Sequence, residues 1–451
     1  MRCSWSVHRR HMKTAFLFGI GFVLTGSLQA GAQRQASIAA EVASVYPAVE
    51  ALYRELHQHP ELSHREDQTA ATLARGLRQI GFDVVTGVGG TGVVGVLRNG
   101  DGPTVMLRTE LDALPLTERT DLPFASRVRM KDATGTEVGV MHACGHDVHM
   151  AAWMGTARVM ASSRDRWRGT LVLVGQPAEE TLDGARAMLA DGLFTRFPRP
   201  DYALAVHDDA RLPAGLVGYR AGPILANMDT VTITLFGRGG HGARPEATVD
   251  PIVLAARVVL ALQTIVSREN SPFDPAVVTI GTIHGGTRNN IIPDEVQLEL
   301  SVRSFTPAVR QRLLAAIDRI AKAEAMAAGA PREPLVERGA GATALVNDAE
   351  FTRRVAAALV RDMGPDAITD ALPEMAAEDL AEFQLAGVST LMLRIGAVEK
   401  SAYEQATRAG TLPIPLHSAS FAPDYEPTLK AAVAAEVVAL RTIMASDLRG
   451  R

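Results

Sequence analysis

The sequence predicts an α/β protein whose larger domain is interrupted by a smaller one. Three observations support this prediction: strand-like apolar segments alternate with helical segments from about residue 39, the rhythm changes near residue 225, and the alternation resumes near residue 338. Strands that alternate with helices form a sheet covered by helices on its faces. We therefore expect a mixed central sheet, flanked by helices and assembled from two separated parts of the chain.

The first part of the larger domain, residues 39–224, begins with a segment of helical periodicity. The glycine-rich segment 87–92 matches the dinucleotide-binding pattern G-x-G-x-x-G, but a strand-like segment follows it where such a loop needs a helix, so we interpret it as a hairpin turn. The assigned helices are 36–62, 146–163 and 183–194, and the assigned strands are 82–100, 103–115, 169–176 and 201–209.

The smaller domain, residues 225–337, shows the order strand, helix, strand, strand, helix. This is the ferredoxin-like order of a small α+β sandwich with one sheet and two helices. Residues 338–446, which include a buried strand at 389–397, are expected to complete the larger domain. In the smaller domain we assign strands to 229–240, 276–286 and 295–305, and helices to 250–269 and 308–330.

The N-terminal segment carries the pattern of a secretory signal. A basic stretch precedes an apolar run that is short for a membrane span, and small residues at 30–32 fit the A-x-A cleavage pattern. We expect residues 1–32 to be a signal peptide cleaved near Ala32, which makes the mature chain periplasmic or secreted. An uncleaved anchor and a start at Met12 are the alternatives. We expect no membrane span in the mature chain.

Charge and cysteine content narrow the classes of function. The formal net charge is −4, and the sequence has no dense basic patch with interleaved aromatic residues, which argues against a nucleic-acid partner. Only two cysteines occur, and cleavage of the signal would remove Cys3. Cys144 then has no partner for an internal disulfide. A lone thiol in an oxidising compartment is buried and inert, reactive, or bound to a metal.

Cys144 lies within the stretch MHACGHDVHM, residues 141–150, which also contains three histidines. Thiolate and imidazole are good ligands for Zn²⁺ and similar ions. Residues two apart in an extended chain point to the same side, but spacing does not decide which of Cys144, His142, His146 and His149 bind. The alternative is a polar helix N-terminus in which Cys144 fills the core.

Carboxylates and further histidines follow other buried segments. Glu179 and Glu180 come directly after an apolar strand, where one carboxylate can bind a metal and the other can act as a general base. His207 is predicted at the tip of a short strand, and His417 lies in a proline-bounded loop. The alternatives are a solvated acidic pair and two structural histidines. Together these residues suit one or two transition-metal ions.

The smaller domain contributes three polar side chains that are candidates for substrate contacts. His241 lies in a glycine-rich loop, Asn290 in the segment GGTRNNIIPD, and Arg303 on a predicted strand. These donors suit a carbonyl oxygen and a carboxylate. Glycine-rich loops also occur for conformational reasons alone.

The ordered series of motifs resembles the M20 family of metallopeptidases, and within it the amidohydrolase branch that includes hippurate hydrolases, aminoacylases and carboxypeptidases. The resemblance covers about residues 40–445. The motifs that carry it are LRTELDALP, MHACGHD, GQPAEE, DYALAVH, GPILANMDTVTI, GGHGARPEATVDPI, NNIIPD, VRSF, EMAAEDLAEF and LHSASFAPDYE.

The resemblance implies a role for each matching position. It makes Glu179 the general base, Asp112 a residue that supports the metal ligands, and the smaller domain a lid through which a homodimer forms. His142 and His149 are then supporting or structural residues. Two divalent ions are implied, for which we expect Zn²⁺ before Mn²⁺, Ni²⁺ or Co²⁺. The implied metal ligands are Cys144, His146, Glu180, His207 and His417, and the implied substrate contacts are His241, Asn290 and Arg303.

Three departures from the family pattern bear on substrate preference. Glu110 replaces the usual aspartate before Asp112, the segment after Glu180 reads TLDGA, and Asp208 and Asp209 form an acidic pair that we place at the edge of the site. None removes a ligand or the base.

The expected function is metal-dependent hydrolysis of an amide bond next to a free carboxylate, in N-acyl amino acids or short peptides. One alternative is a periplasmic protein that binds such molecules with its metal and does not turn them over. A weaker alternative is metal storage or delivery.

Overall fold

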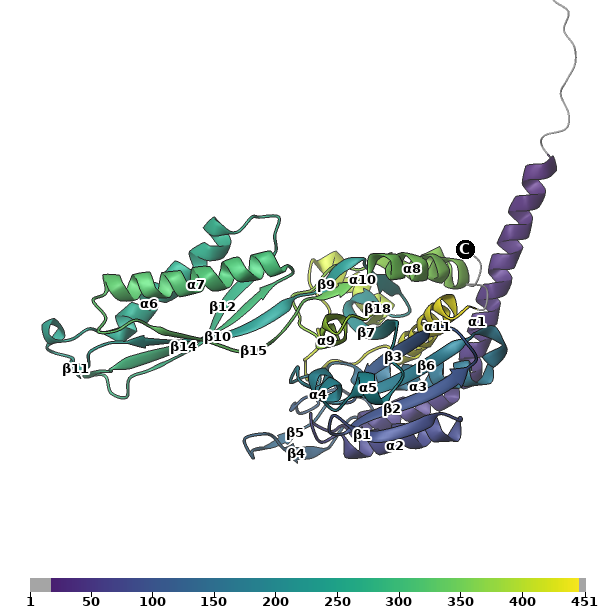
Figure 1. Ribbon diagram of the computed structural model, residues 1–451, viewed down its shortest axis with the longest axis horizontal. Helices are drawn as coiled ribbons and strands as arrows, with labels where there is room; N and C mark the ends of the chain where they lie inside the picture. The colour runs from purple at the N-terminus through teal and green to yellow at the C-terminus, as the bar shows by residue number, and fades with distance from the viewer. Residues whose placement is uncertain (1–17, 446–451) are drawn as a thin grey trace, which may run out of the picture.

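A mixed eight-stranded sheet forms the centre of the larger domain in the computed structural model, which describes residues 18–445 (Figure 1). The four central strands β6, β3, β7 and β18 are parallel, whereas β1 and β2 add antiparallel at one side. Strand β18 follows the smaller domain in sequence, and it pairs with β7, which precedes the smaller domain. The mixed sheet built from two parts of the chain is therefore confirmed. In spatial order the strands are β1 (Asp83–Val88), β2 (Gly92–Asn99), β6 (Gly169–Gln176), β3 (Thr104–Glu110), β7 (Tyr202–Pro213), β18 (Ser389–Val398), β8 (Val217–Tyr219) and β17 (Ile368–Asp370).

Alternate residues of the central strands enter two different cores, as the two-residue period of a strand requires. Leu107 and Leu204 belong to the core under one set of helices, and Met106 and Ala203 belong to the core on the opposite face. The helices of the first core are α1 (Phe18–Gln58), α2 (Asp67–Gln79), α3 (His146–Ser162), α8 (Ala349–Met363) and α11 (Tyr425–Ile443), and those of the second are α4 (Gly184–Ala190), α5 (Leu193–Arg196) and α9 (Ala381–Leu385).

A four-stranded antiparallel sheet with two helices on it forms the smaller domain, which extends away from the larger one (Figure 1). Asp250 and Thr306 cap the helices through side-chain bonds to backbone N–H groups. The edge strand β15 was not predicted, because its glycine-rich sequence lacks a strand pattern, and it continues past residue 337. The elements are β12 (Ala276–Gly285), β14 (Glu295–Ser304), β10 (Asn227–Phe236), β15 (Leu335–Ala342), α6 (Pro251–Thr264) and α7 (Pro307–Ala327).

The segment Pro251–Glu269, which is α6 and the π-helical turn after it, is apolar and long enough to cross a membrane by length and composition. Leu254, Val258 and Leu262 of this segment are buried against the small sheet. This is the pattern of a core helix in a globular domain. Among the described residues it is the one helix that passes this test.

The N-terminal helix α1 includes the expected cleavage site near Ala32. The basic stretch of the expected signal lies outside the described residues. From Ile38 onward, α1 buries apolar side chains such as Val49 and Tyr53 in the first core.

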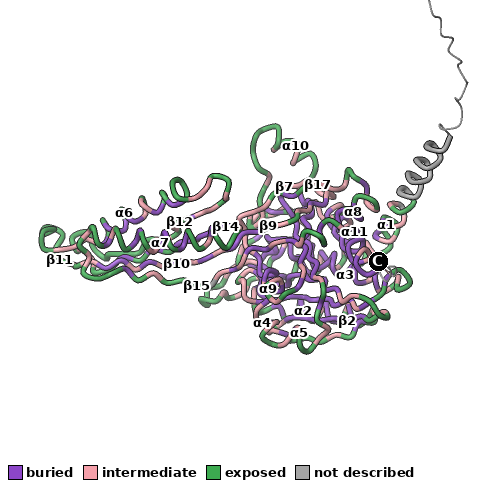
Figure 2. Tube along the Cα trace, turned by 45° about the horizontal axis from the view of Figure 1, so that its top comes forward, coloured by how far each residue is buried: buried purple, intermediate pink, exposed green. Residues whose placement is uncertain are grey.

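Figure 2 shows that buried residues concentrate in the larger domain. Several short elements connect the main strands and helices. The segment 87–92 is the turn between β1 and β2, as predicted. The remaining elements are the strand pairs β4 (Arg129–Lys131) with β5 (Glu137–Gly139), β9 (Gly222–Leu225) with β16 (Leu345–Asn347) and β11 (Gly240–His241) with β13 (Ile291–Ile292), and the exposed helix α10 (Lys400–Ala409).

Candidate metal centre

The loop before α3 presents Cys144 and His146 to strand β7. Gly145 lies between them in the left-handed region, with φ of 76°, and caps α3. A Cβ atom on this residue would lie 2.2 Å from Oδ2 of Asp208. A residue with a side chain would therefore push the loop away from β7, and only glycine lets the two segments approach so closely.

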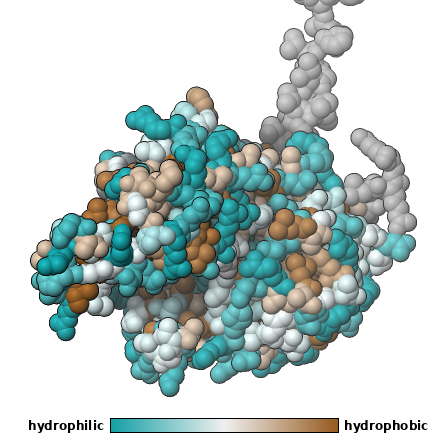
Figure 3. All heavy atoms as spheres, turned by 60° about the vertical axis from the view of Figure 1, so that its left-hand side comes forward, coloured by the Kyte–Doolittle hydropathy of each residue, from teal (hydrophilic) through white to brown (hydrophobic). Residues whose placement is uncertain are grey.

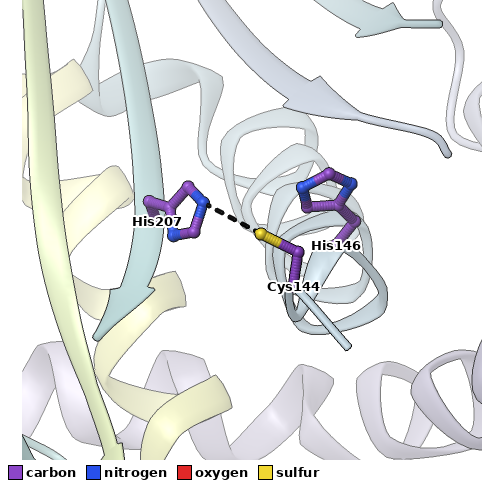
Figure 4. Close-up of side chains that lie close together, drawn as sticks. All are labelled: Cys144, His146 and His207. Atoms are coloured by element: carbon purple, nitrogen blue, oxygen red, sulfur yellow. Dashed lines mark hydrogen bonds between the residues drawn. The ribbon is translucent and has the colours of Figure 1, made fainter. Parts of the chain in front are cut away.

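The structure brings all five predicted metal ligands together from four segments of the chain. The Cys144 Sγ atom lies 3.6 Å from Nε2 of His207 and 3.2 Å from Nε2 of His417. Nε2 of His417 lies 3.6 Å from Oε1 of Glu180. Figure 4 shows the thiol between the rings of His146 and His207, and the donor atoms of these three residues lie within 4.8 Å of one another.

The donor atoms of this cluster fit a transition metal. Nε2 of His146 and Oε1 of Glu180 are buried and have no hydrogen-bond partner in the described part of the chain. Buried polar atoms are almost always satisfied, so two unpartnered atoms beside a thiol fit a metal site. Thiolate, imidazole and carboxylate are the donors that Zn²⁺ takes in proteins.

Burial shapes the electrostatics of the cluster. Burial and the carboxylates of Glu180 and Glu179 raise the pKa of the Cys144 thiol well above its ordinary value. The thiolate therefore needs a nearby cation, which a bound metal supplies. Burial also raises the pKa of Glu180 to about 7, although His146 opposes this effect.

Glu179 lies beside the candidate metal ligands. Its Oε2 lies 3.7 Å from Nε2 of His146. Burial, Glu378 and Glu180 raise the pKa of this carboxyl well above its usual range, which suits proton transfer near neutral pH. The carboxylates of Glu179 and Glu180 both approach His146, and Ala178, in the turn after β6, has a φ of 53°.

Asp112 connects two of the predicted ligands. Its carbonyl oxygen accepts a hydrogen bond from Nδ1 of His146 at 2.8 Å, and its Oδ2 accepts from the backbone N–H of Glu180 at 2.9 Å and from Ser63 at 2.7 Å. These contacts fix the His146 ring and the turn that carries Glu180.

One prediction about β7 is wrong. His207 lies in the middle of this strand, because β7 continues to pair with β18 as far as Pro213. Asp208 and Asp209 are buried beside the site: Oδ1 of Asp208 lies 3.2 Å from Nδ1 of His207, and Asp209 contacts Arg394, which lines the cavity. His149 lies between Glu110 and Asp208 and not against the thiol, and His142 is a buried ring whose pKa burial lowers to about 4.

A cavity of about 460 Å³ opens beside the cluster. Arg303 reaches it from β14 of the smaller domain and donates to the carbonyl oxygen of Met375 at 2.6 Å. Its other hydrogen bonds go to the neutral groups of Ser301 and Met228. The cavity is lined by Cys144, Glu179, Glu180, Leu182, His207, Leu225, Met228, Arg303, Glu374, Ala376, Ala377, Glu378, Arg394, Leu416 and His417.

The other two predicted substrate contacts lie far from this cavity. His241 is on β11 at the distal end of the smaller domain (Figure 1), and both His241 and Asn290 are exposed. The Asn290 carbonyl oxygen accepts a hydrogen bond from Gly242, which keeps the two loops together. Within the described chain, the structure does not bring these donors to the metal ligands.

Sequence reasoning missed a buried cation that organises the floor of the site. Arg108 on β3 is fully buried and donates to Glu378 at 2.7 Å and to Asp379 at 3.1 Å, and it also contacts Glu110. Glu378 lines the cavity. The sequence did contain a signal for this cation. An arginine within the apolar strand VMLRTE is expected to be buried, and a buried arginine needs carboxylate partners.

A pair of histidines, a thiol and two carboxylates at the mouth of a cavity define the class of protein as a metal-dependent hydrolase. Comparison with known proteins gives the same class. The profile of "Peptidase family M20/M25/M40" matches residues 106–408. The chain belongs to this family, and it is a metal-dependent amidohydrolase.

Individual relatives support this assignment. The chain is 36% identical over 334 residues to thermostable carboxypeptidase 1 of Saccharolobus solfataricus, covering 73% of this chain and 81% of the relative. It is 36% identical over 338 residues to N-acetyl-L-cysteine deacetylase of Bacillus subtilis, covering 73% and 76%. The solved structure of the Bacillus subtilis YXEP protein, a dinuclear metal-binding M20 peptidase, matches with a TM-score of 0.73 at 28% identity, covering 89% of this chain and 99% of that one.

Proposed function

We propose that this protein hydrolyses the amide bond of N-acyl amino acids or short peptides next to a free α-carboxylate. The observation that carries the proposal is Glu179, a buried carboxyl of raised pKa beside the metal-ligand cluster and facing the cavity. A protein that only binds such molecules has no use for a base at this position.

The metal site supplies one part of the chemistry. When bound, two divalent ions, for which we propose Zn²⁺, would polarise the scissile carbonyl and lower the pKa of a water molecule. Cys144, His146, Glu180, His207 and His417 would hold them. Glu179 accepts the proton of the attacking water and later delivers it to the leaving amine.

The cavity offers groups for both ends of such a substrate. The Arg303 guanidinium, whose hydrogen-bond partners are all neutral, suits the free carboxylate. Leu182, Met228 and Leu416 line the same cavity and suit an apolar acyl group or side chain. The relatives named as a carboxypeptidase and as an N-acetyl-L-cysteine deacetylase support this substrate class.

The distal position of His241 and Asn290 supports a homodimer through the smaller domain. Strand β12 is an edge of its sheet, and the outer face of α6 exposes Ile252, Val253 and Leu260. Figure 3 turns this domain toward the viewer and shows hydrophobic residues among hydrophilic ones on its surface. Pairing of two chains along the β12 edge and the outer face of α6 would carry His241 toward the cavity of the partner. There, His241 would stabilise the developing oxyanion.

We also propose that residues 1–32 are removed on export, so that the mature enzyme acts in the periplasm or outside the cell. The basic, apolar and small-residue order of the N-terminal sequence supports this location.

The test is amine release from a panel of N-acyl amino acids and dipeptides, by the purified protein and by Glu179→Gln. We expect chelator-sensitive release by the wild type and a loss of about 10²-fold or more in Glu179→Gln, with bound metal unchanged. The matched control is Glu350→Gln, on the exposed surface of α8, which keeps full activity. Bound metal with no release across the panel would favour the binding-protein alternative. Normal turnover by Glu179→Gln would remove the general-base assignment.

A further inference from the structure

Two histidines of the metal-ligand cluster are held by aspartates in the same way. Nδ1 of His146 lies 2.8 Å from the carbonyl oxygen of Asp112 and 3.4 Å from its Oδ1. Nδ1 of His207 lies 2.9 Å from the carbonyl oxygen of Asp208 and 3.2 Å from its Oδ1. All four oxygens are acceptors, so each Nδ1 carries the proton and each Nε2 keeps a lone pair for the metal.

The Asp208 carboxylate is itself fixed in place. It is fully buried, and its Oδ1 lies 3.3 Å from Nε2 of His149. Nδ1 of His149 lies 3.0 Å from Oε2 of Glu110, which contacts Arg108. On its other side, the carboxylate packs against Gly145 at the N-terminus of α3. The carboxylate thus lies in a buried chain of polar groups that ends at His207.

We infer that Asp208 is the positioning residue of His207, as Asp112 is for His146. A carboxylate on the far nitrogen of a ligand histidine fixes the tautomer and the ring orientation and makes the metal-binding nitrogen more basic. The inference rests on the proposed function only in requiring metal at this site.

The next residue of the strand offers a matched control. Asp209 is also buried and carries the same charge, but its carboxylate contacts Arg211 at 2.7 Å and Arg394 at 3.3 Å and no histidine. The Asp209→Asn substitution removes a buried carboxylate from the same strand and leaves the contacts of the His207 ring in place.

The experiment is a competitive Zn²⁺ titration of the metal-free mature protein, repeated with Co²⁺ while the absorption of the thiolate–cobalt site is recorded. In Asp208→Asn, we expect one of the two metal equivalents to bind roughly 10- to 100-fold more weakly, with an altered cobalt spectrum. The second equivalent, at the Cys144, Glu180 and His417 group, should keep its affinity. Asp209→Asn should bind both equivalents like the wild type. Asp112→Asn should weaken both, because Oδ2 of Asp112 also accepts a hydrogen bond from the backbone N–H of Glu180.

A measurement on the wild type decides the question if Asp208→Asn does not fold. Nitrogen NMR of the zinc-loaded protein should place the proton of His207 on Nδ1 and the metal on Nε2. Metal on Nδ1, or a folded Asp208→Asn that binds both equivalents normally, would overturn the inference. Normal metal binding without amide hydrolysis would leave it standing and refute the proposed function, whereas a wild type that binds no metal would refute both.

Discussion

Two groups of predicted site residues differ in how completely a single chain assembles them. One is the metal-ligand cluster of the larger domain, and the other is the pair His241 and Asn290 of the smaller domain. Cys144, His146 and His207 are buried, whereas the His417 side chain is exposed and its Nε2 lies 3.2 Å from Sγ of Cys144. Asp112 accepts a hydrogen bond from the His146 ring. His241 and Asn290 are exposed at the distal end of the smaller domain. Folding of one chain therefore assembles the candidate metal ligands, whereas the substrate contacts that we propose for His241 and Asn290 require closure of the domains or pairing of two chains.

The largest effect should come from breaking the cluster. Cys144→Ala removes the donor that lies nearest to both His207 and His417. We expect metal affinity to fall by more than the roughly 10- to 100-fold that loss of an outer-shell partner costs, and activity to fall with it. Metal analysis after dialysis measures this effect. Unchanged metal content would mean that Cys144 is a core residue and not a metal ligand.

A large effect should also follow from the one smaller-domain donor that already reaches the cavity. Arg303→Met leaves the substrate carboxylate unpaired, which should cost about 2 kcal/mol or more, or ~30-fold in kcat/KM. The effect should appear mainly in KM and should be smaller for substrates without the free carboxylate. The control is Arg338→Met, at an exposed arginine on the edge strand β15 of the same sheet, which should be neutral.

The distal donors allow a direct test of pairing between chains. His241→Ala and Glu179→Gln should each be inactive alone. An equal mixture should regain about a quarter of the wild-type activity, since about half the dimers are mixed and each mixed dimer contains one complete site. A mixture that stays inactive, although the chains are shown to exchange, would mean that His241 serves the cavity of its own chain through domain closure.

The smallest predicted effect concerns the stability of the larger domain, in which His57 is buried. Burial lowers the pKa of His57, but hydrogen bonds to Asp147 and Glu118 outweigh burial and raise the pKa to about 10. A pKa raised on folding contributes stability that is complete below the unfolded value, near 6.5, and is lost as the pH rises through about 10. The free energy of unfolding should therefore decline between pH 7 and 10.

The control for this prediction is His57→Gln, which should be less stable at pH 7 and should show a flatter pH dependence over this range. Equal slopes for the two proteins would show that His57 does not carry the charge.

The sequence was sufficient to predict the types of the metal-ligand residues and the two sheets. It was not sufficient to predict which residues hydrogen-bond to the ligand histidines. Glycine at position 145 and the strand before Glu179 are local signals that bring donors to one end of the sheet. The role of Asp208 has no such signal, because its contact with His207 depends on how α3 packs against β7. The distance of His241 from the cavity was equally hidden, because the relative placement of two domains is not encoded in local periodicity.

The most direct test of the central claim is the metal-to-protein ratio of the purified mature protein, measured after removal of loosely bound ions and again after chelation and reloading. We predict two divalent ions per chain, with amide hydrolysis lost on chelation and restored with the metal. A chain that binds no metal after supplementation, or that keeps its activity without metal, would contradict the assignment of Cys144 and its neighbours as a metal centre.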